Sequence, residues 1–238
     1  MLTGAGISTE SGIPDFRSPG GLWTRYDPRK LTFDKFCASA DTRRLYWEMG
    51  NELYPALRDA QPNAAHRALV ALERRGGVRR IVTQNVDGLH QKAGSSPNVM
   101  IEIHGTALEV GCLTCGARQD RGPVQARFAA GEQELRCDCG GLLKPATISF
   151  GQAMPERETA MAFADAESAD VFLVIGSSLE VYPAAGLPRA AVENGAPLLI
   201  VNRDPTPYDD DAELTLHGSA GKTLGAIVSA LGLSLTDA

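Results

Sequence analysis

Short apolar runs alternate with amphipathic stretches along the 238 residues of this chain. Apolar runs of strand length cover Val78–Thr83, Val171–Gly176 and Leu198–Asn202, and each ends in a polar or glycine-rich turn. Segments with helical periodicity cover Ala64–Arg74, Glu156–Ser168, Ala184–Asn194 and Gly221–Leu231. This alternation predicts an α/β fold with an open, parallel sheet and helices on both faces. In such a sheet the turns meet at the carboxyl ends of the strands, where ligands bind.

Two segments interrupt the alternation. Residues 22–60 carry aromatic and apolar side chains at helical spacing, and residues 106–144 are rich in glycine and cysteine but poor in apolar residues. We expect both to be insertions, one helical and one metal-binding, that together form a small second domain. The remaining segments, 1–21, 61–105 and 145–238, are then expected to form a Rossmann-like nucleotide-binding domain.

A glycine-rich turn, Gly4-Ala5-Gly6, follows an apolar stub of only three residues, Met1–Thr3. Small residues let the backbone approach a phosphate, and the amides of the turn can bind the anion, although ordinary turns carry the same pattern. The usual third glycine is replaced by Thr9, which weakens a dehydrogenase interpretation. Shortly afterwards Asp15-Phe16-Arg17 combines a carboxylate, an aromatic ring and a guanidinium, groups that suit the other end of a dinucleotide.

Charge and composition narrow the class of protein. The chain has 29 acidic and 23 basic residues, a formal net charge of −6. A basic stripe is absent from the sequence, so we expect no direct binding of nucleic acid. No apolar run approaches the ~20 residues of a membrane-spanning helix, so we expect no membrane partner. No leader is visible and the cysteines fit reduced thiols, which predicts a cytoplasmic location. The oligomeric state is left open, with a monomer favoured.

Four of the five cysteines form two pairs, Cys112-x-x-Cys115 and Cys137-x-Cys139, separated by 21 residues. A glycine follows each pair directly. Four thiolates on two tight turns suit a tetrahedral zinc ion and leave no ligand position for a substrate. We therefore predict one structural zinc that stabilises an insertion without a core of its own. The alternative is that these cysteines bind no metal, and the short second pair departs from the commoner Cys-x-x-Cys.

Five blocks of sequence carry a resemblance to a known family. They are residues 1–17, 83–90 (Thr-Gln-Asn-Val-Asp-Gly-Leu-His), 103–105 (Ile-His-Gly), 176–178 (Gly-Ser-Ser) and 201–207. In this order they resemble the sirtuins of bacterial type, which are NAD-dependent protein-lysine deacylases. The resemblance implies NAD as co-substrate, acyl-lysine proteins as partners, and nicotinamide and O-acyl-ADP-ribose as products. A protein ADP-ribosyltransferase or an NAD hydrolase on the same scaffold is the alternative.

The resemblance also implies roles for individual residues. His104 matches the general base of the family, whereas His66, His90 and His217 are expected to be structural. Asn85 and Asp87 are expected to complete the catalytic group around the reactive ribose. The contacts expected for NAD come from Gly4, Ala5, Gly6, Ser8, Ile13, Asp15, Phe16, Arg17, Gln84, Asn85, Asp87, His104, Gly176, Ser177, Ser178, Asn202 and Arg203.

The acyl pocket is predicted from the helical insertion. Sirtuins that prefer succinyl or malonyl lysine carry Tyr-x-x-Arg there, and the corresponding residues here are Tyr46 and Met49. Without a cation, a buried acyl carboxylate would be strongly unfavourable, so we expect acetyl and other neutral acyl groups. Arg43 or Arg44 are the alternatives for the missing cation. The remaining substrate contacts are expected from Ile148, Phe150 and Gly151, in a segment that pairs with the substrate peptide as a strand.

Overall fold

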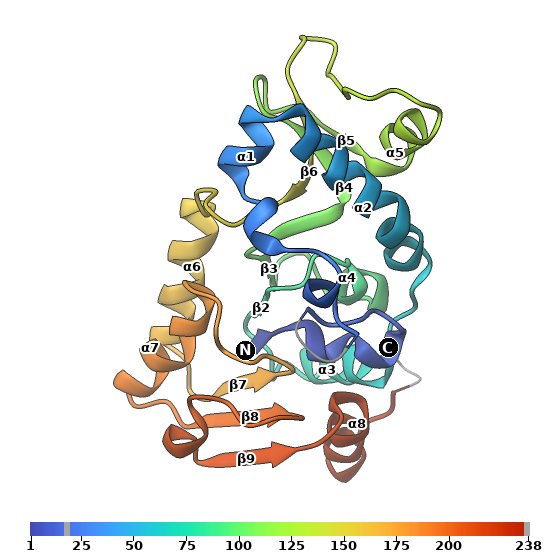
Figure 1. The fold of residues 1–238 in the computed structure, drawn as a ribbon. Coiled ribbons are helices and arrows are strands. Elements are labelled where there is room, and N and C mark those ends of the chain that lie inside the picture. The colour runs from blue at the N-terminus through green and yellow to red at the C-terminus, as the bar shows by residue number, and fades with distance from the viewer. Residues whose placement is uncertain (17–19, 236–238) are drawn as a thin grey trace.

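The computed structural model describes residues 1–16 and 20–235, and its strands form two sheets (Figure 1). Six strands form the larger sheet in the order β3-β2-β1-β7-β8-β9, and all neighbours in it are parallel. Their bounds are β1 Leu2–Thr3, β2 Ile81–Thr83, β3 Met100–Glu102, β7 Phe172–Ile175, β8 Leu198–Asn202 and β9 Leu214–His217. The predicted parallel sheet is therefore confirmed.

The strand order reverses between β1 and β7. The chain adds β2 and β3 on one side of β1, and later adds β7, β8 and β9 on the other. Loops that leave β1 and β7 therefore diverge, and ligands of open α/β sheets bind at such a switch point. The glycine-rich turns at 4–6 and 176–178 directly follow these two strands. The topology thus brings the two turns together.

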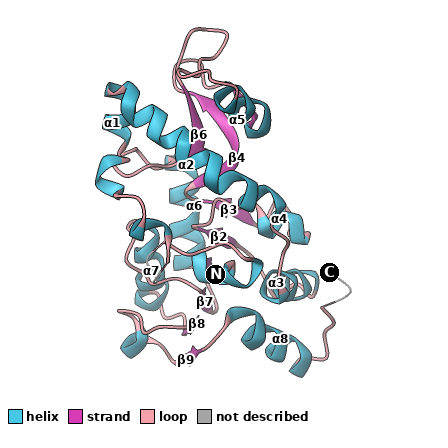
Figure 2. Ribbon diagram, turned by 45° about the vertical axis from the view of Figure 1, so that its right-hand side comes forward, coloured by secondary structure: helices cyan, strands magenta, loops and turns pink. Residues whose placement is uncertain are grey.

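Helices cover both faces of the larger sheet, as Figures 1 and 2 show. Their bounds are α3 Ala64–Arg74, α4 Leu89–Ala93, α6 Glu156–Glu167, α7 Leu187–Glu193 and α8 Ala220–Ala230. Side chains alternate between the two faces of a strand. Accordingly Val174 packs in a core with α6 and α7, whereas its neighbour Ile175 packs in a core with α3 and α8.

A second group of elements lies at the top of the molecule in Figure 1. It contains a three-stranded antiparallel sheet in the order β5-β4-β6 and three helices. Their bounds are α1 Phe33–Ala38, α2 Ala40–Asp59, β4 Gly105–Cys112, β5 Arg118–Asp120, α5 Arg121–Ala129 and β6 Leu143–Thr147. Trp47 of α2 is buried with Val110, Val124 and Leu143. The helical and cysteine-rich insertions therefore share one apolar core, and their assignment to a separate domain stays a prediction.

The predicted elements differ from the observed ones mainly in length. The strand expected at Val78–Thr83 begins only at Ile81. The helix expected at Ala184–Asn194 begins as a 3₁₀ turn, Ala184–Gly186, before α7. Pro188 explains the second difference, because proline lacks an amide proton and is tolerated only in the first turn of an α-helix.

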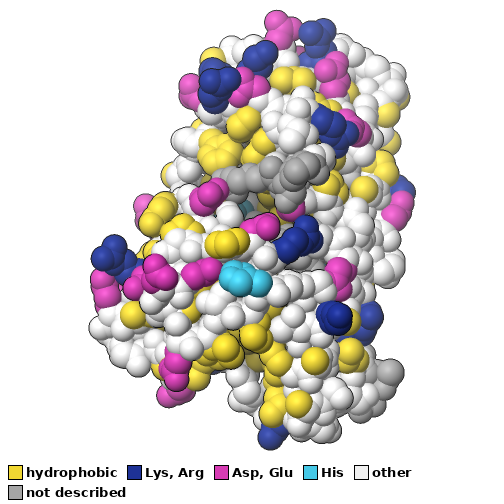
Figure 3. All heavy atoms as spheres, turned by 60° about the horizontal axis from the view of Figure 1, so that its bottom comes forward, with side chains coloured by type: hydrophobic (Ala, Val, Ile, Leu, Met, Phe, Trp, Pro, Cys, Tyr) yellow, Lys and Arg dark blue, Asp and Glu magenta, His cyan; other side chains and the backbone are white. Residues whose placement is uncertain are grey.

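None of the described helices is long and apolar enough to cross a bilayer. On the face drawn in Figure 3, basic and acidic side chains are interspersed. That distribution fits the modest formal net charge of −6. The surface in this view has no extended patch of one sign that would steer a strongly charged partner.

Candidate active site

The two glycine-rich turns contact each other backbone to backbone. The Gly6 amide donates to the Gly176 carbonyl at 2.8 Å. A Cβ on Gly6 would lie 2.7 Å from Gly176 Cα, and a Cβ on Gly4 would lie 2.7 Å from the Gly176 carbonyl oxygen. Gly176 itself has φ of +61°, a conformation that other residues rarely adopt. Only glycine fits at these three positions, and the turn after β1 therefore keeps its backbone accessible to a ligand.

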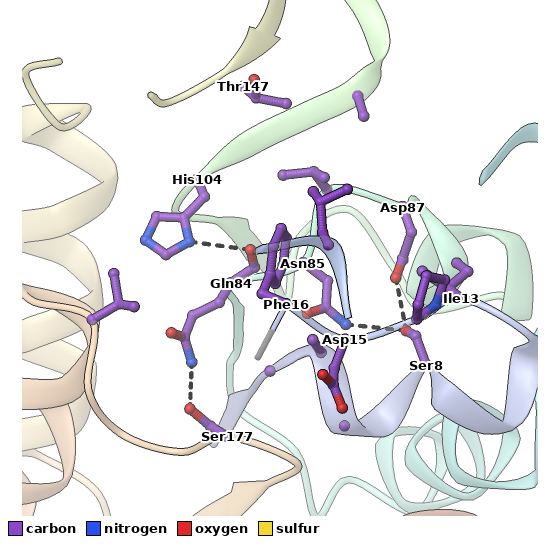
Figure 4. Close-up of a pocket in the computed structure, with 18 of the residues that line it drawn as sticks. Ser8, Ile13, Asp15, Phe16, Gln84, Asn85, Asp87, His104, Thr147 and Ser177 are labelled. Atoms are coloured by element: carbon purple, nitrogen blue, oxygen red, sulfur yellow. Dashed lines mark hydrogen bonds between the residues drawn. The ribbon is translucent and has the colours of Figure 1, made fainter. Parts of the chain in front are cut away.

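A cavity of about 510 Å³ opens between these turns and the second group of elements. It is lined by every residue predicted to bind NAD or the acyl group except Arg17, which lies outside the described residues. Figure 4 shows labelled side chains from the turn after β1, the segment after β2 and the junction of β3 with β4 around this space. Small-molecule sites typically measure ~300–1,000 Å³. The cavity thus has a size that suits a dinucleotide.

A buried hydrogen-bond network joins the first turn to the segment after β2. Asn85 Nδ2 donates to Ser8 Oγ at 3.1 Å, and Ser8 Oγ donates to Asp87 Oδ2 at 2.7 Å (Figure 4). The other Asp87 oxygen accepts the Leu89 amide at 2.9 Å. Burial raises the pKa of Asp87, and these hydrogen bonds offset part of that rise. Since both its carboxylate oxygens are engaged, Asp87 orients Ser8 and, through Ser8, Asn85.

The tautomer of His104 is set by a backbone carbonyl. Its Nδ1 lies 3.1 Å from the Gln84 carbonyl oxygen (Figure 4). A carbonyl can only accept, so Nδ1 carries the proton and Nε2 keeps a free lone pair. Burial lowers the pKa of His104, and the hydrogen bond to Gln84 raises it in part. His104 therefore lines the cavity as a neutral imidazole that can take a proton.

Gln84 connects His104 to the second glycine-rich turn. While its carbonyl holds His104, its side-chain amide donates to Ser177 Oγ at 2.8 Å. At the other side of the switch point, Asn202 ends β8 and donates through Nδ2 to the Asp204 carbonyl at 2.7 Å. Both Asn202 and Ser177 line the cavity. Polar groups at the ends of β2, β7 and β8 thus line one ligand space.

Aromatic rings form one wall of the cavity. The ring centroids of Phe16 and Trp23 are 5.3 Å apart, and those of Trp23 and Phe150 are 6.1 Å apart. Phe150 is 45% exposed, so the apolar wall continues to the surface. An apolar wall of this kind can limit the access of water to a bound substrate.

The segment after β6 lies between the two groups of elements. The Ile148 amide donates to the His104 carbonyl at 2.8 Å, which fixes this segment beside the imidazole. Tyr46 Oη donates to the Leu31 carbonyl at 2.9 Å and lies 2.6 Å from Ser149 Oγ. The phenol of Tyr46 therefore anchors α2 to the segment and is not available as a free donor in the cavity.

The four paired cysteines converge at the far end of the small sheet. All their Sγ atoms lie within 4.8 Å of one another, with Cys112 and Cys139 at 3.5 Å and Cys115 and Cys137 at 3.8 Å. A disulfide would require about 2.05 Å. Four thiolates around zinc, each at ~2.3 Å from the ion, are separated by ~3.8 Å in a tetrahedron. The cluster fits a structural zinc ion, and the shorter Cys-x-Cys pair does not prevent this geometry.

The other histidines are not placed for proton transfer. His66 accepts the Asn63 amide at 3.3 Å in a capping box at the start of α3. Burial lowers the pKa of His66 to about 3 and that of His90 to about 4, so both stay neutral. His217 pairs with Asp209 at 3.5 Å. None of the three lines the cavity.

Sequence reasoning missed several residues of the cavity wall. Trp23, Tyr182 and Ser219 line it, and so does Arg121 of the cysteine-rich insertion. Trp23 and Tyr182 lie close in sequence to the segments that resemble the sirtuins, so their positions could have indicated that they line the cavity. Arg121 had no such signal, because only the packing of α5 against α2 brings it to the cavity.

Comparisons with known proteins identify the family of this chain. The model of the Sir2 family matches residues 4–183. The chain is 47% identical to NAD-dependent protein deacetylase 2 of Streptomyces coelicolor, over 98% of this chain and 97% of that protein. A solved Sir2 complex with a deacetylated p53 peptide and 3'-O-acetyl ADP ribose superposes with a TM-score of 0.91, at 35% identity over 98% of this chain and 93% of the other. A complex of Sir2 with a p53 peptide and NAD+ gives a TM-score of 0.88, at 36% identity over 97% and 92%. The chain belongs to the Sir2 family.

Proposed function

We propose that this protein is an NAD-dependent protein-lysine deacetylase in which His104 is the general base. The acetyl group moves from the lysine nitrogen to the ribose of NAD, nicotinamide leaves, and one water is consumed. The products are free lysine, nicotinamide and O-acetyl-ADP-ribose. The curated relatives named as deacetylases and the solved complexes with NAD+ and a deacetylated product support this activity. The observation that carries the proposal is that His104 lines the same cavity as the two glycine-rich turns.

The roles of the residues follow from their hydrogen bonds. The phosphates of the dinucleotide would bind at Gly4-Ala5-Gly6, where small residues let them approach the backbone. The Ala5 amide would donate to them, because the amides of Gly4 and Gly6 already donate to the carbonyls of Ile175 and Gly176. NAD supplies the ribose carbon that receives the acyl oxygen. Ser8 and Asp87 orient the Asn85 side chain, which would lie beside that carbon when NAD is bound. Nε2 of His104 takes a proton from a ribose hydroxyl, since Nδ1 is already protonated.

Exclusion of water distinguishes this reaction from simple hydrolysis of NAD. Phe16, Trp23 and Phe150 form an apolar wall beside the reacting groups. An amide oxygen is a weak nucleophile, so it reacts only when it is held in line and when competing water is absent. This wall favours deacetylation over the NAD hydrolase alternative.

The helical insertion supplies an acyl pocket that accepts acetyl and short neutral groups. Met49 and Leu53 of α2 line the cavity together with Leu31. Tyr46 cannot donate to an acyl group because its hydroxyl is already engaged by Leu31 and Ser149. Leu31 and Met49 pack with Tyr46, and these apolar side chains favour neutral acyl groups there.

The metal acts on the fold and takes no part in the chemistry. Cys112, Cys115, Cys137 and Cys139 would hold one zinc ion as a closed set of four ligands. The same insertion packs on Trp47 of α2, so the ion stabilises the wall of the acyl pocket indirectly. Reduced thiolates require a reducing compartment, which supports the cytoplasm as the location.

A histidine substitution tests the assignment of the base. In His104→Ala, deacetylation should fall by at least about 100-fold, because a general base typically contributes that much. Binding of NAD, measured by calorimetry, should change little, since the imidazole acts after the dinucleotide is bound. His217→Ala, on the surface and outside the cavity, is the matched control. Deacetylation within about tenfold of the parent, or ~1.4 kcal/mol of barrier, would exclude His104 as the base.

A further inference from the structure

A buried lysine lies behind the segment that follows β6. Lys144 is only 1% exposed and does not line the cavity, whereas its neighbour Pro145 does. Its Nζ lies 5.8 Å from the ring centroid of Tyr46. Within residues 1–16 and 20–235, no carboxylate pairs with Lys144. Burial lowers the pKa of Lys144 to about 7, and the Cys37 thiol opposes part of that shift. A buried ammonium group is unfavourable unless its hydrogen bonds are satisfied, so the bonds that it makes indicate its role.

The ladder between β4 and β6 is interrupted beside this lysine. Thr147 pairs with Gly105 and Pro145 pairs with Val110, so β4 advances by five residues where β6 advances by two. Lys144 spans the interruption, because its Nζ donates to the Thr147 carbonyl at 2.6 Å and to the Pro145 carbonyl at 3.3 Å. Hydrogen bonds from a charged donor are roughly twice as strong as neutral ones. The lysine thus fixes the end of β6 where the regular ladder is broken.

Thr147 is the last residue of β6 and the first of a run, residues 147–152, that lines the cavity. The next amide, of Ile148, donates to the His104 carbonyl at 2.8 Å. A displacement of the Thr147 carbonyl would therefore move the start of this run relative to the cavity. The imidazole of His104 has a separate anchor, the Gln84 carbonyl at 3.1 Å. Lys144 is consequently placed to control the run without controlling the general base.

We propose that Lys144 is a positioning residue for the substrate peptide: its ammonium group holds the end of β6, so that residues 148–151 present their backbone to the acyl-lysine peptide in one fixed arrangement. The proposal rests on the proposed deacetylase function and adds a residue that lies behind the cavity. A strand that is already ordered loses less conformational entropy when a peptide pairs with it, and it therefore binds the peptide more tightly.

Lys144→Met tests this role, because methionine keeps an unbranched chain of similar length without the charge or the donors. The Kd of an acetyl-lysine peptide, measured by calorimetry without NAD, should rise by about tenfold, as for the loss of a hydrogen bond from a charged donor. KM for NAD, and kcat at a saturating concentration of the peptide, should stay within about threefold of the parent. The glycine-rich turns and the imidazole of His104 keep their own anchors in this variant.

Lys92→Met is the matched control. Lys92 of α4 also donates to two backbone carbonyls, those of Ala60 at 2.6 Å and Arg58 at 3.5 Å. It is exposed and does not line the cavity. The same chemical change at Lys92 should therefore leave the Kd of the peptide unchanged.

Hydrogen exchange measures the order of the segment directly. In Lys144→Met without substrate, the backbone amides of residues 143–152 should exchange about tenfold faster than in the parent, because the local structure opens more often. Binding of the acetyl-lysine peptide should slow this exchange again. The amides of residues 1–12, which contain the first glycine-rich turn, should exchange at the parent rate.

The outcomes distinguish this proposal from the function on which it rests. A peptide Kd within about twofold of the parent in Lys144→Met, or unchanged exchange at residues 143–152, overturns the proposal. Equal weakening of peptide and NAD binding also overturns it, because that result indicates a general loss of structure. If Lys144→Met does not fold, Lys144→Gln takes its place under the same limits. If the parent removes no acetyl group from any lysine peptide, the proposed function fails instead.

Discussion

Replacing Gly6 by alanine tests whether the contact between the two turns is required for NAD binding. The new Cβ would lie 2.7 Å from Gly176 Cα and 2.9 Å from its carbonyl oxygen, and both atoms belong to the backbone. An ordinary contact begins near 3.4 Å, so one of the turns must shift by several tenths of an ångström. Overpacking of this kind typically costs ~1–3 kcal/mol.

The shift should lower the stability of the protein and weaken the binding of NAD. For a chain of 238 residues, each kcal/mol lowers the melting temperature by about 2–4 °C. The amides of the first turn move with the shift, so KM for NAD should rise about tenfold, equivalent to ~1.4 kcal/mol. Initial rates of nicotinamide release at varied NAD, with saturating acetyl-lysine peptide, measure this KM.

Gly225→Ala is the matched control. Gly225 lies in helix α8, and among the described residues its Cβ would meet only Leu235 Cδ1, at 3.8 Å. Alanine in a helix is more favourable than glycine by ~0.5–1 kcal/mol, so this variant should melt slightly higher and keep the parent KM. If Gly6→Ala retained the parent melting temperature and a KM within about twofold, the close contact of the turns would not be what forms the phosphate site.

Three other predictions follow from the site. Because burial lowers the pKa of His104, the neutral base persists as pH falls, so kcat/KM should hold its plateau below the ordinary imidazole pKa of about 6.5; an acid limb centred above 6.5 contradicts this. Asp87→Asn should not lower the melting temperature, because burial raises the pKa of Asp87 and makes its charge destabilising at neutral pH. It should nevertheless lower kcat about tenfold or more, since Ser8 loses its acceptor, and a fully active variant refutes the orienting role. Cys115→Ser should lower zinc content and melting temperature together, whereas Cys37→Ser, outside the cluster, should change neither.

Much of the site is predictable from the sequence because it depends on the ends of parallel strands. Asn85, Ser177 and Asn202 each follow an apolar run closely, and the carboxyl ends of parallel strands meet at one edge. The glycines at 4, 6 and 176 can also be recognised in the sequence, because close backbone contacts at the ends of strands require glycine. The cysteine pairs can be recognised in the sequence because two closely spaced pairs of cysteines are typical of zinc sites.

Packing between the insertions is what the sequence does not reveal. Arg121 follows Trp47 by 74 residues in the sequence, and no periodicity connects them. Only the shared core around Trp47 brings α5 to α2. Likewise, the sequence predicts that Tyr46 contacts the acyl group but does not show that its hydroxyl is bonded to Leu31 and lies next to Ser149.

The products formed from NAD and an acetyl-lysine peptide test the central claim most directly. Mass spectrometry of the complete reaction should find O-acetyl-ADP-ribose, nicotinamide and deacetylated peptide in equal amounts. Equal amounts are expected because the acetyl group leaves lysine only when nicotinamide leaves NAD. Free ADP-ribose with an intact acetyl peptide, or ADP-ribose attached to protein, would contradict the account.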